Sequence, residues 1–127
     1  MSTNKFNQMQ GLTEKVAVIV PSTIDVNKEI DNKEAVRAVL MSLSNLFGGA
    51  SAIEQEGGWV SQTHGLVVES NTMVYAYASE LTNDDLNHVY TLAEQLAYNM
   101  NQEAIAVEIN NNLYFVEQSE QDQTEAI

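Results

Sequence analysis

Residues 72–78 read TMVYAYA, a stretch in which bulky and small side chains alternate with a period of two. Val, Thr and Tyr favour strands, and side chains two apart point to the same face of a sheet. The stretch therefore predicts a strand that carries Met73, Tyr75 and Tyr77 on one face and smaller side chains on the other. One face of such a strand is expected to pack against the helices and the other to stay open.

The sequence on either side of this strand predicts the remaining elements. A turn at 62–65 joins the strand, which spans 66–78, to an earlier strand. Apolar periodicity, glycines and turn residues define the others, which are strands at 15–21, 51–61, 103–109 and 113–117 and helices at 31–47 and 83–101. Asp31 and Glu34 have the spacing of a capping box, and Thr82 is the predicted N-cap of the second helix.

This order predicts the fold class. Strand, helix, strand, strand, helix and strand follow one another, which is the βαββαβ order of a ferredoxin-like α+β sandwich, here with an extra C-terminal hairpin strand. Right-handed crossovers place both helices on one face of the antiparallel sheet. We expect a single domain at 14–117 between flexible tails at 1–13 and 118–127.

The other sheet face is predicted to be apolar and uncovered by helices. Met73, Tyr75 and Tyr77 lie on it, and an apolar face of that size is rarely left in water. We expect it to pack against a second copy in a homodimer. The alternative is that the N-terminal tail covers it.

Charge separates the chain into two parts. The sequence has 18 acidic and 5 basic residues, for a net charge of −13. Residues 1–37 hold five of each sign, so residues 38–127 carry thirteen acids and no Lys or Arg. Direct binding to nucleic-acid phosphates or to anionic membranes needs clustered bases and is disfavoured. A basic protein partner is compatible with this charge.

Several function classes lack their signals. The chain has no Cys, no apolar run of membrane-spanning length and no apolar N-terminal leader, so a cytoplasmic location is expected. Glycine-rich phosphate loops and nucleophile motifs are also missing from the sequence. No cofactor and no catalytic residue are therefore expected, and an enzyme is the less favoured class.

Residues 47–78, FGGASAIEQEGGWVSQTHGLVVESNTMVYAYA, carry a resemblance. Gly58, Trp59 and Glu69 match the Gly-Trp and strand-Glu positions of the central hairpin in a family of small bacterial proteins described only as a domain of unknown function. The chain lacks the export signal and the proline-bearing entry segment of that family. The resemblance implies the same order of helices and strands and no particular activity.

Four polar side chains in the same hairpin are candidates for chemistry. Glu54 and Glu56 lie two apart on one strand, His64 lies in the turn, and Glu69 lies on the returning strand. Glu54, Glu56 and His64 are possible ligands of a divalent metal, although no metal is expected because the alternative is a set of solvated strand residues. Trp59, the single tryptophan, is either an interface anchor or a core residue at a bulge.

Together these observations predict a non-enzymatic, acidic binding protein. We expect an inhibitor or regulator encoded by a phage or mobile element that binds a basic nucleic-acid-binding protein. Imitation of DNA is one way in which the acidic residues could act, and the alternative is that they only keep the protein soluble. Its contacts would come from Trp59, from the Met73, Tyr75 and Tyr77 face, and from Glu54, Glu56 and Glu69. The alternatives are a small ligand-binding protein or enzyme with a pocket in a ferredoxin-like dimer, and a structural subunit of an assembly.

Overall fold

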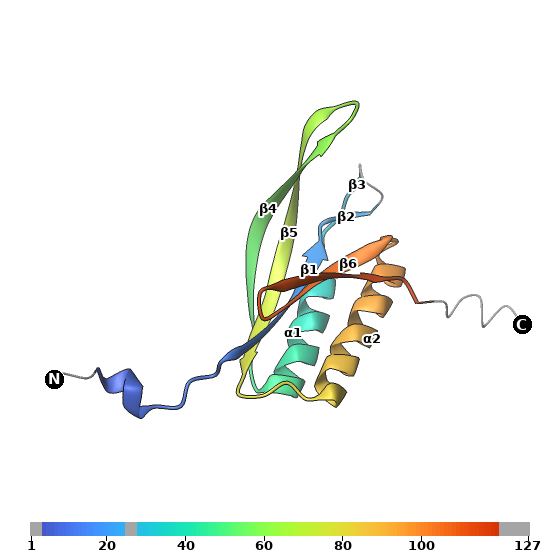
Figure 1. Ribbon diagram of the computed structural model, residues 1–127. Coiled ribbons are helices and arrows are strands. Elements are labelled where there is room, and N and C mark those ends of the chain that lie inside the picture. Colours follow the sequence, from blue (N-terminus) through green and yellow to red (C-terminus); the bar gives the residue numbers. More distant parts are fainter. Residues whose placement is uncertain (1–3, 25–27, 120–127) are drawn as a thin grey trace, which may run out of the picture.

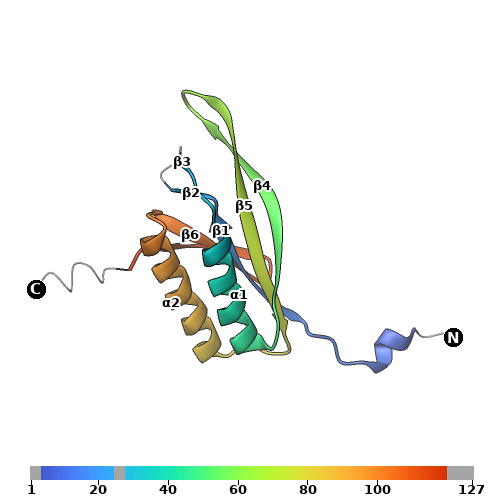
Figure 2. The same cartoon turned by 180° about the vertical axis from the view of Figure 1, so that it is seen from behind.

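A five-stranded antiparallel sheet forms one layer of the molecule and two helices form the other (Figures 1 and 2). The computed structural model describes residues 4–24 and 28–119. The strands of the sheet are β1 (Glu14–Pro21), β4 (Ser51–Ser61), β5 (Gly65–Ala78), β6 (Ala104–Ile109) and β7 (Asn112–Glu117). Their order is β4-β5-β1-β6-β7. The predicted ferredoxin-like α+β class, with an extra C-terminal strand, is confirmed.

The helices α1 (Lys33–Phe47) and α2 (Asn83–Asn99) pack on the same face of the sheet (Figure 2). The core between the layers contains Val18 at the centre of β1, Val74 on β5 and Leu43 on α1, each with no exposed surface. Alternation along β5 buries Val74 and Ala76 in this core and directs Tyr75, which lies between them, to the other face, as predicted.

The helix ends show one error in the sequence interpretation. Thr82 caps α2 as predicted, and Asp85 completes the capping box with its side chain on the Thr82 backbone amide. At α1 the predicted box of Asp31 and Glu34 is wrong, because the helix begins two residues after Asp31 and Asn32 occupies the N-cap. Asp31 instead accepts a hydrogen bond from the Lys33 backbone amide at 3.0 Å.

Two further elements lie in segments predicted as loop or tail. A short ribbon, β2 (Thr23–Ile24) with β3 (Lys28–Glu29), interrupts the connection from β1 to α1. The N-terminal segment contains a short 3-10 helix, η1 (Lys5–Gln8). Residues 4–13 are all exposed, so the described part of this segment does not cover the sheet. Most of the predicted C-terminal tail, residues 120–127, lies outside the described residues.

The β4–β5 hairpin is much longer than the sheet to which it belongs. β1 pairs with β5 only as far as Pro21 opposite Asn71. Beyond that point residues 57–69 pair only with each other, from Gly57 opposite Glu69 to Ser61 opposite Gly65. We call residues 57–69 the arm, and the rest of the sheet with its helices the body. Figure 1 shows the arm, in green and yellow, rising free of the body.

Candidate functional site

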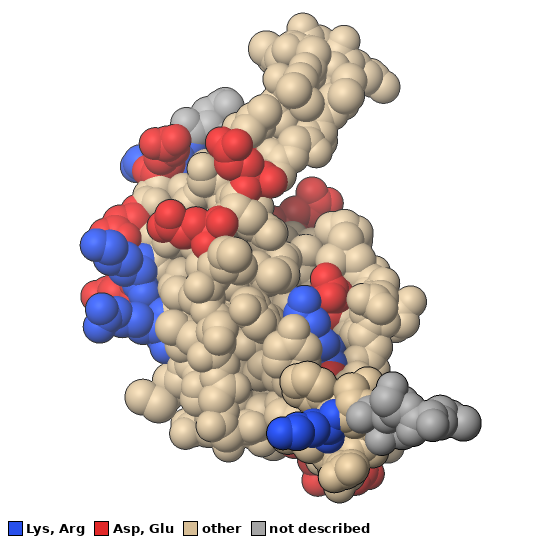
Figure 3. Space-filling view, turned by 90° about the vertical axis from the view of Figure 1, so that its left-hand side faces the viewer, with Lys and Arg blue, Asp and Glu red and all other residues tan. Residues whose placement is uncertain are grey.

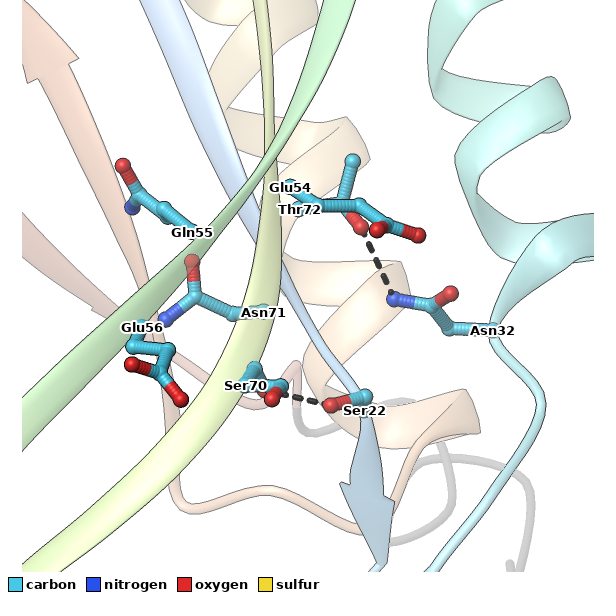
Figure 4. Close-up of a pocket in the computed structure, with 8 residues that line it drawn as sticks. All are labelled: Ser22, Asn32, Glu54, Gln55, Glu56, Ser70, Asn71 and Thr72. Atoms are coloured by element: carbon cyan, nitrogen blue, oxygen red, sulfur yellow. Dashed lines mark hydrogen bonds between the residues drawn. The ribbon is translucent and has the colours of Figure 1, made fainter.

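A polar pocket lies where the arm leaves the body. It has a volume of about 320 Å³, which is at the lower end of the range for small-molecule sites. Its walls come from the end of β1, the start of α1 and both strands of the hairpin (Figure 4). The lining residues are Ser22, Asn32, Glu54, Gln55, Glu56, Ser70, Asn71 and Thr72.

Hydrogen bonds across the pocket join these elements. The Asn32 side-chain amide donates to the Pro21 carbonyl at 3.2 Å and to the Thr72 hydroxyl at 3.4 Å. The Ser22 hydroxyl donates to the Ser70 carbonyl. Because Asn32 is also the N-cap residue of α1, one side chain links the helix, β1 and β5 at the pocket floor.

Two carboxylates supply the charge of the pocket. Glu54 lies opposite Thr72 and Glu56 lies opposite Ser70 in the β4–β5 ladder. In Figure 4 the Glu54 side chain is on the side of Asn32, whereas the Glu56 side chain lies beside Asn71. The twist of a two-stranded ribbon accounts for this divergence of residues two apart. The two carboxylates therefore reach the pocket from different directions and make it attractive to a cation.

Asn71 gives the pocket an unpaired polar atom. Its side-chain oxygen is buried and has no hydrogen-bond partner among the described residues. Buried polar atoms nearly always have a partner, so this one calls for a bound water or ligand. In Figure 4 this oxygen lies on the side of Gln55, whereas the nitrogen of the same amide lies on the side of Glu56.

A second pocket continues the first along α1. It holds about 290 Å³ and shares Asn32, Glu54 and Thr72 with the polar pocket. Lys33 and Arg37, four apart on one face of α1, line its outer side. In the described part of the chain neither base forms an ion pair. The joined pockets thus carry carboxylates at one end and free bases at the other.

The structure separates the predicted metal ligands. Glu54 and Glu56 lie at the base of the arm, whereas His64 lies at its tip, where its ring nitrogen bonds the Thr63 hydroxyl at 2.7 Å. Five residues of extended strand, about 17 Å at 3.3 Å per residue, lead from Glu56 to Ser61, and His64 lies beyond them in the turn. Residues 4–24 and 28–119 contain no group of three His, Asp or Glu side chains that could hold a metal.

The other predicted site residues occupy three different places. Glu69 lines a small pocket of about 180 Å³ on the opposite side of the arm base. Trp59 lies on the arm with 46% of its surface exposed, so the core alternative does not apply. Tyr75 and Tyr77 lie on the helix-free sheet face, as predicted, with their rings in an edge-to-face contact at 5.9 Å. Lys15 covers the Tyr75 ring at 5.2 Å and pairs with Glu108 at 3.7 Å.

Sequence reasoning found the two glutamates of the pocket and missed its amides and bases. Asn32, Asn71, Lys33 and Arg37 belong to no recognisable motif, because they come together only through the pairing of β5 with β1 and the position of α1. The one local signal was the concentration of all Lys and Arg before residue 38.

Two solved structures share this architecture. A phage SAM lyase in complex with S-methyl-5'-thioadenosine superposes with a TM-score of 0.63 and 21% identity, over 87% of this chain and 92% of the other. A phage SAM lyase in the apo state gives a TM-score of 0.63 and 19% identity, over 87% and 96%. No protein-family model matches the chain, and no curated protein sequence matches it. The similarity establishes a common fold.

These comparisons correct the functional interpretation of the sequence. The expectation of a non-enzymatic acidic inhibitor is wrong, because the proteins that share this fold over nearly its whole length are phage enzymes. The preference against an enzyme is wrong for the same reason. The alternative of a small enzyme or ligand-binding protein is favoured, and the phage association agrees with these structures. The resemblance of residues 47–78 to an uncharacterised family stays a prediction. Neither helix in the described residues is long and apolar enough to cross a membrane.

Proposed function

We propose that the chain is an enzyme that binds S-adenosylmethionine and cleaves it as a lyase. The observation that carries this proposal is the similarity of fold to a phage SAM lyase that holds S-methyl-5'-thioadenosine. The joined pockets at the arm base supply independent support, since their carboxylates at one end and their bases at the other complement the charged groups of this substrate.

S-adenosylmethionine carries two positive groups, the sulfonium and the α-ammonium, and one α-carboxylate. Glu54 and Glu56 complement the positive groups. Lys33 and Arg37, at the other end of the joined pockets, complement the carboxylate. Asn71, with its unpaired oxygen, offers an acceptor to a ribose hydroxyl or to the exocyclic amine of adenine.

The proposed reaction breaks the bond between the sulfonium sulfur and the terminal carbon of the amino-acid chain. The electron pair of that bond stays on sulfur, which becomes the neutral thioether of S-methyl-5'-thioadenosine. A lyase adds no water, so the terminal carbon of the four-carbon fragment must replace the lost bond to sulfur with a new bond inside the fragment. It does so either by bonding its own carboxylate oxygen or by losing a proton from the adjacent carbon. The protein's part is to orient the chain and exclude water.

The test is to incubate the full chain with S-adenosylmethionine in ¹⁸O-labelled water and follow both products by mass spectrometry. We expect S-methyl-5'-thioadenosine to form faster than in a protein-free blank, together with a four-carbon product that contains no ¹⁸O at the moment of release. Product formation at the blank rate would overturn the proposal, and an ¹⁸O-labelled primary product would identify a hydrolase instead.

Three Glu→Gln variants, two in the pocket and one outside it, test whether the pocket is the active site. Glu54→Gln and Glu56→Gln each remove one carboxylate from the pocket and are expected to lower kcat/KM at least about tenfold, equivalent to about 1.4 kcal/mol. Glu80→Gln makes the same change on an exposed residue after β5, at the opposite end of that strand, and should leave the rate unchanged. Equal rates for all three variants would place the active site elsewhere.

A further inference from the structure

The second pocket of the joined pair brings opposite charges together. Lys33 and Arg37 line it from α1, and Glu54 lines it from β4. Figure 3 shows this kind of mixture on the body, where basic and acidic side chains lie beside one another, whereas the projecting arm carries neither colour. Because residues 38–127 contain no Lys or Arg, few places on this protein can combine both signs.

The two bases of this pocket have no partner within their own chain. Lys33 and Arg37 are exposed and lie four residues apart on α1, where like charges repel each other. Neither forms an ion pair in the described part of the chain, although the protein has 18 acidic residues. Two adjoining bases beside a pocket suit a carboxylate, which can accept hydrogen bonds from both of them.

Asn32 adds an oriented acceptor to the same pocket. Its side-chain nitrogen donates to the Pro21 carbonyl at 3.2 Å and to the Thr72 hydroxyl at 3.4 Å, and these bonds fix the amide. The side chain makes no capping bond to α1. In Figure 4 the nitrogen lies on the side of Thr72 and the oxygen on the opposite side. This oxygen and the Glu54 carboxylate are both acceptors, which suits an ammonium group with its three donors.

The rest of the lining of this pocket is apolar. Val36 and Leu40 are partly buried against the core, and Ala52 contributes its methyl group from β4. An α-amino acid with an unbranched chain has the same combination of groups, because its carboxylate and ammonium share one carbon and methylene groups follow. The second pocket therefore matches the amino-acid end of S-adenosylmethionine better than it matches the adenosine end.

We infer, on the basis of the proposed function, that the second pocket binds the α-amino-acid end of S-adenosylmethionine and that the polar pocket takes the nucleoside. Lys33 and Arg37 hold the carboxylate. Glu54 and the Asn32 oxygen hold the ammonium. The sulfonium then lies toward Glu56, which lines the polar pocket and not the second one. The site therefore selects ligands whose amino-acid end is an intact zwitterion.

The spacing of the two glutamates agrees with this orientation. Residues two apart on a strand are about 6.6 Å apart, and Glu54 and Glu56 have that relation on β4. In the substrate three carbon atoms separate the α-nitrogen from the sulfur, which is a span of similar size. Figure 4 shows Glu54 on the side of Asn32 and Glu56 beside Asn71, so the positive groups would follow one another from the second pocket into the polar pocket.

Equilibrium binding separates the two ends of the ligand. S-adenosylhomocysteine keeps the amino-acid end and has no sulfonium to cleave, whereas S-methyl-5'-thioadenosine lacks that end. In calorimetry we expect the unmodified protein to bind S-adenosylhomocysteine at least about tenfold more tightly. The double variant Lys33→Gln, Arg37→Gln should lose about tenfold in affinity for S-adenosylhomocysteine and less than about twofold for S-methyl-5'-thioadenosine.

Lys28→Gln is the matched control for this variant. Lys28 is an exposed base on β3 that lines neither pocket, so its substitution should leave the binding of both ligands unchanged. Equal weakening of the two ligands by the double variant, or no weakening of either, would overturn the inference.

The two glutamates supply a second measurement. S-adenosylhomocysteine carries the ammonium and not the sulfonium, so Glu54→Gln should weaken its binding at least about threefold. Glu56→Gln should change that binding less than about twofold, although it lowers the rate with S-adenosylmethionine. Equal effects of the two variants on S-adenosylhomocysteine, or the reverse order, would refute the assignment of the positive groups.

These binding measurements do not depend on turnover. A chain that cleaves S-adenosylmethionine but binds S-adenosylhomocysteine no more tightly than S-methyl-5'-thioadenosine keeps the proposed function and contradicts the amino-acid subsite. A chain with the expected binding pattern that forms no product keeps the subsite and contradicts the lyase. Failure of the unmodified protein to bind either ligand would contradict the subsite.

Discussion

The inner and outer parts of β5 form one continuous strand, but the inner part packs under the helices and the outer part does not. From Thr72 to Ala76 alternate residues are buried under the helices, with Val74 fully enclosed. From Gly65 to Ser70 no residue of the same strand is buried, and Leu66 is 68% exposed. Both parts make the same ladder with β4. The difference shows that strand pairing alone does not create a stable layer, and that the body owes its stability to the helices packed on it.

The strongest test of this contrast removes one leucine from each region. Leu43→Ala empties a fully buried site and is expected to lower the free energy of unfolding by about 2–5 kcal/mol. Leu66→Ala in the arm should change it by less than about 0.5 kcal/mol when the protein is dilute enough to be monomeric. Urea denaturation followed by circular dichroism measures both. Similar losses would mean that the arm is part of the cooperative core.

A second test concerns the long-range contacts found only in the body. Asn110 has a φ of 49°, accepts a hydrogen bond from the Lys15 amide at 2.8 Å and donates its own amide to the Lys15 carbonyl at 3.0 Å. Asn110→Ala loses the side-chain bond and strains the backbone, for an expected cost of about 2 kcal/mol. Asn110→Gly keeps the backbone conformation and should recover about half. No difference between the two variants would exclude backbone strain as a cause.

A third test isolates a local contribution within the body. Thr82→Ala removes the hydroxyl that accepts from the Asp85 amide at 3.1 Å and should cost about 1 kcal/mol in thermal or urea unfolding. Thr82→Ser keeps the acceptor and is the control. If serine fails to restore the stability, the methyl group of threonine rather than the cap is responsible.

The smallest expected effect lies in the arm. Gly57→Ala meets only the Asn71 side-chain nitrogen, at 3.4 Å, and needs no positive φ. Alanine should therefore stabilise the ribbon by about 0.5 kcal/mol through a lower chain entropy in the unfolded state. Hydrogen exchange of arm amides such as Val67 should slow, while that of the Val74 amide stays unchanged. A slower exchange at Val74 would show that the two regions open together.

The fold could be predicted because its signals are local. Thr82, the alternation around Tyr75 and the glycines after Phe47 each act within a few residues, and they agree with one another. The α1 cap was misplaced because Asp31 and Asn32 are both good capping residues and the choice depends on the bonds that Asn32 makes to β1 and β5.

The candidate site was harder to predict, since it depends on tertiary neighbours. Glu54 and Glu56 could be singled out from the sequence because a carboxylate is a possible metal ligand in any fold. Asn71 and Arg37 became functional candidates only when strand pairing and helix packing brought them to the same pockets. A strongly negative net charge, read as the property of an inhibitor, said nothing about where the few bases would lie.

The central position of β1 has a consequence for how the chain is made. β1 is near the N-terminus, yet one of its two neighbours is β6, and the bond from Lys15 to Asn110 spans 95 residues. During synthesis β1 leaves the ribosome well before β6 and keeps one open edge until residues 104–109 have followed. Contacts of such sequence separation slow folding, so the sheet of the nascent chain cannot be completed before β6 has been made.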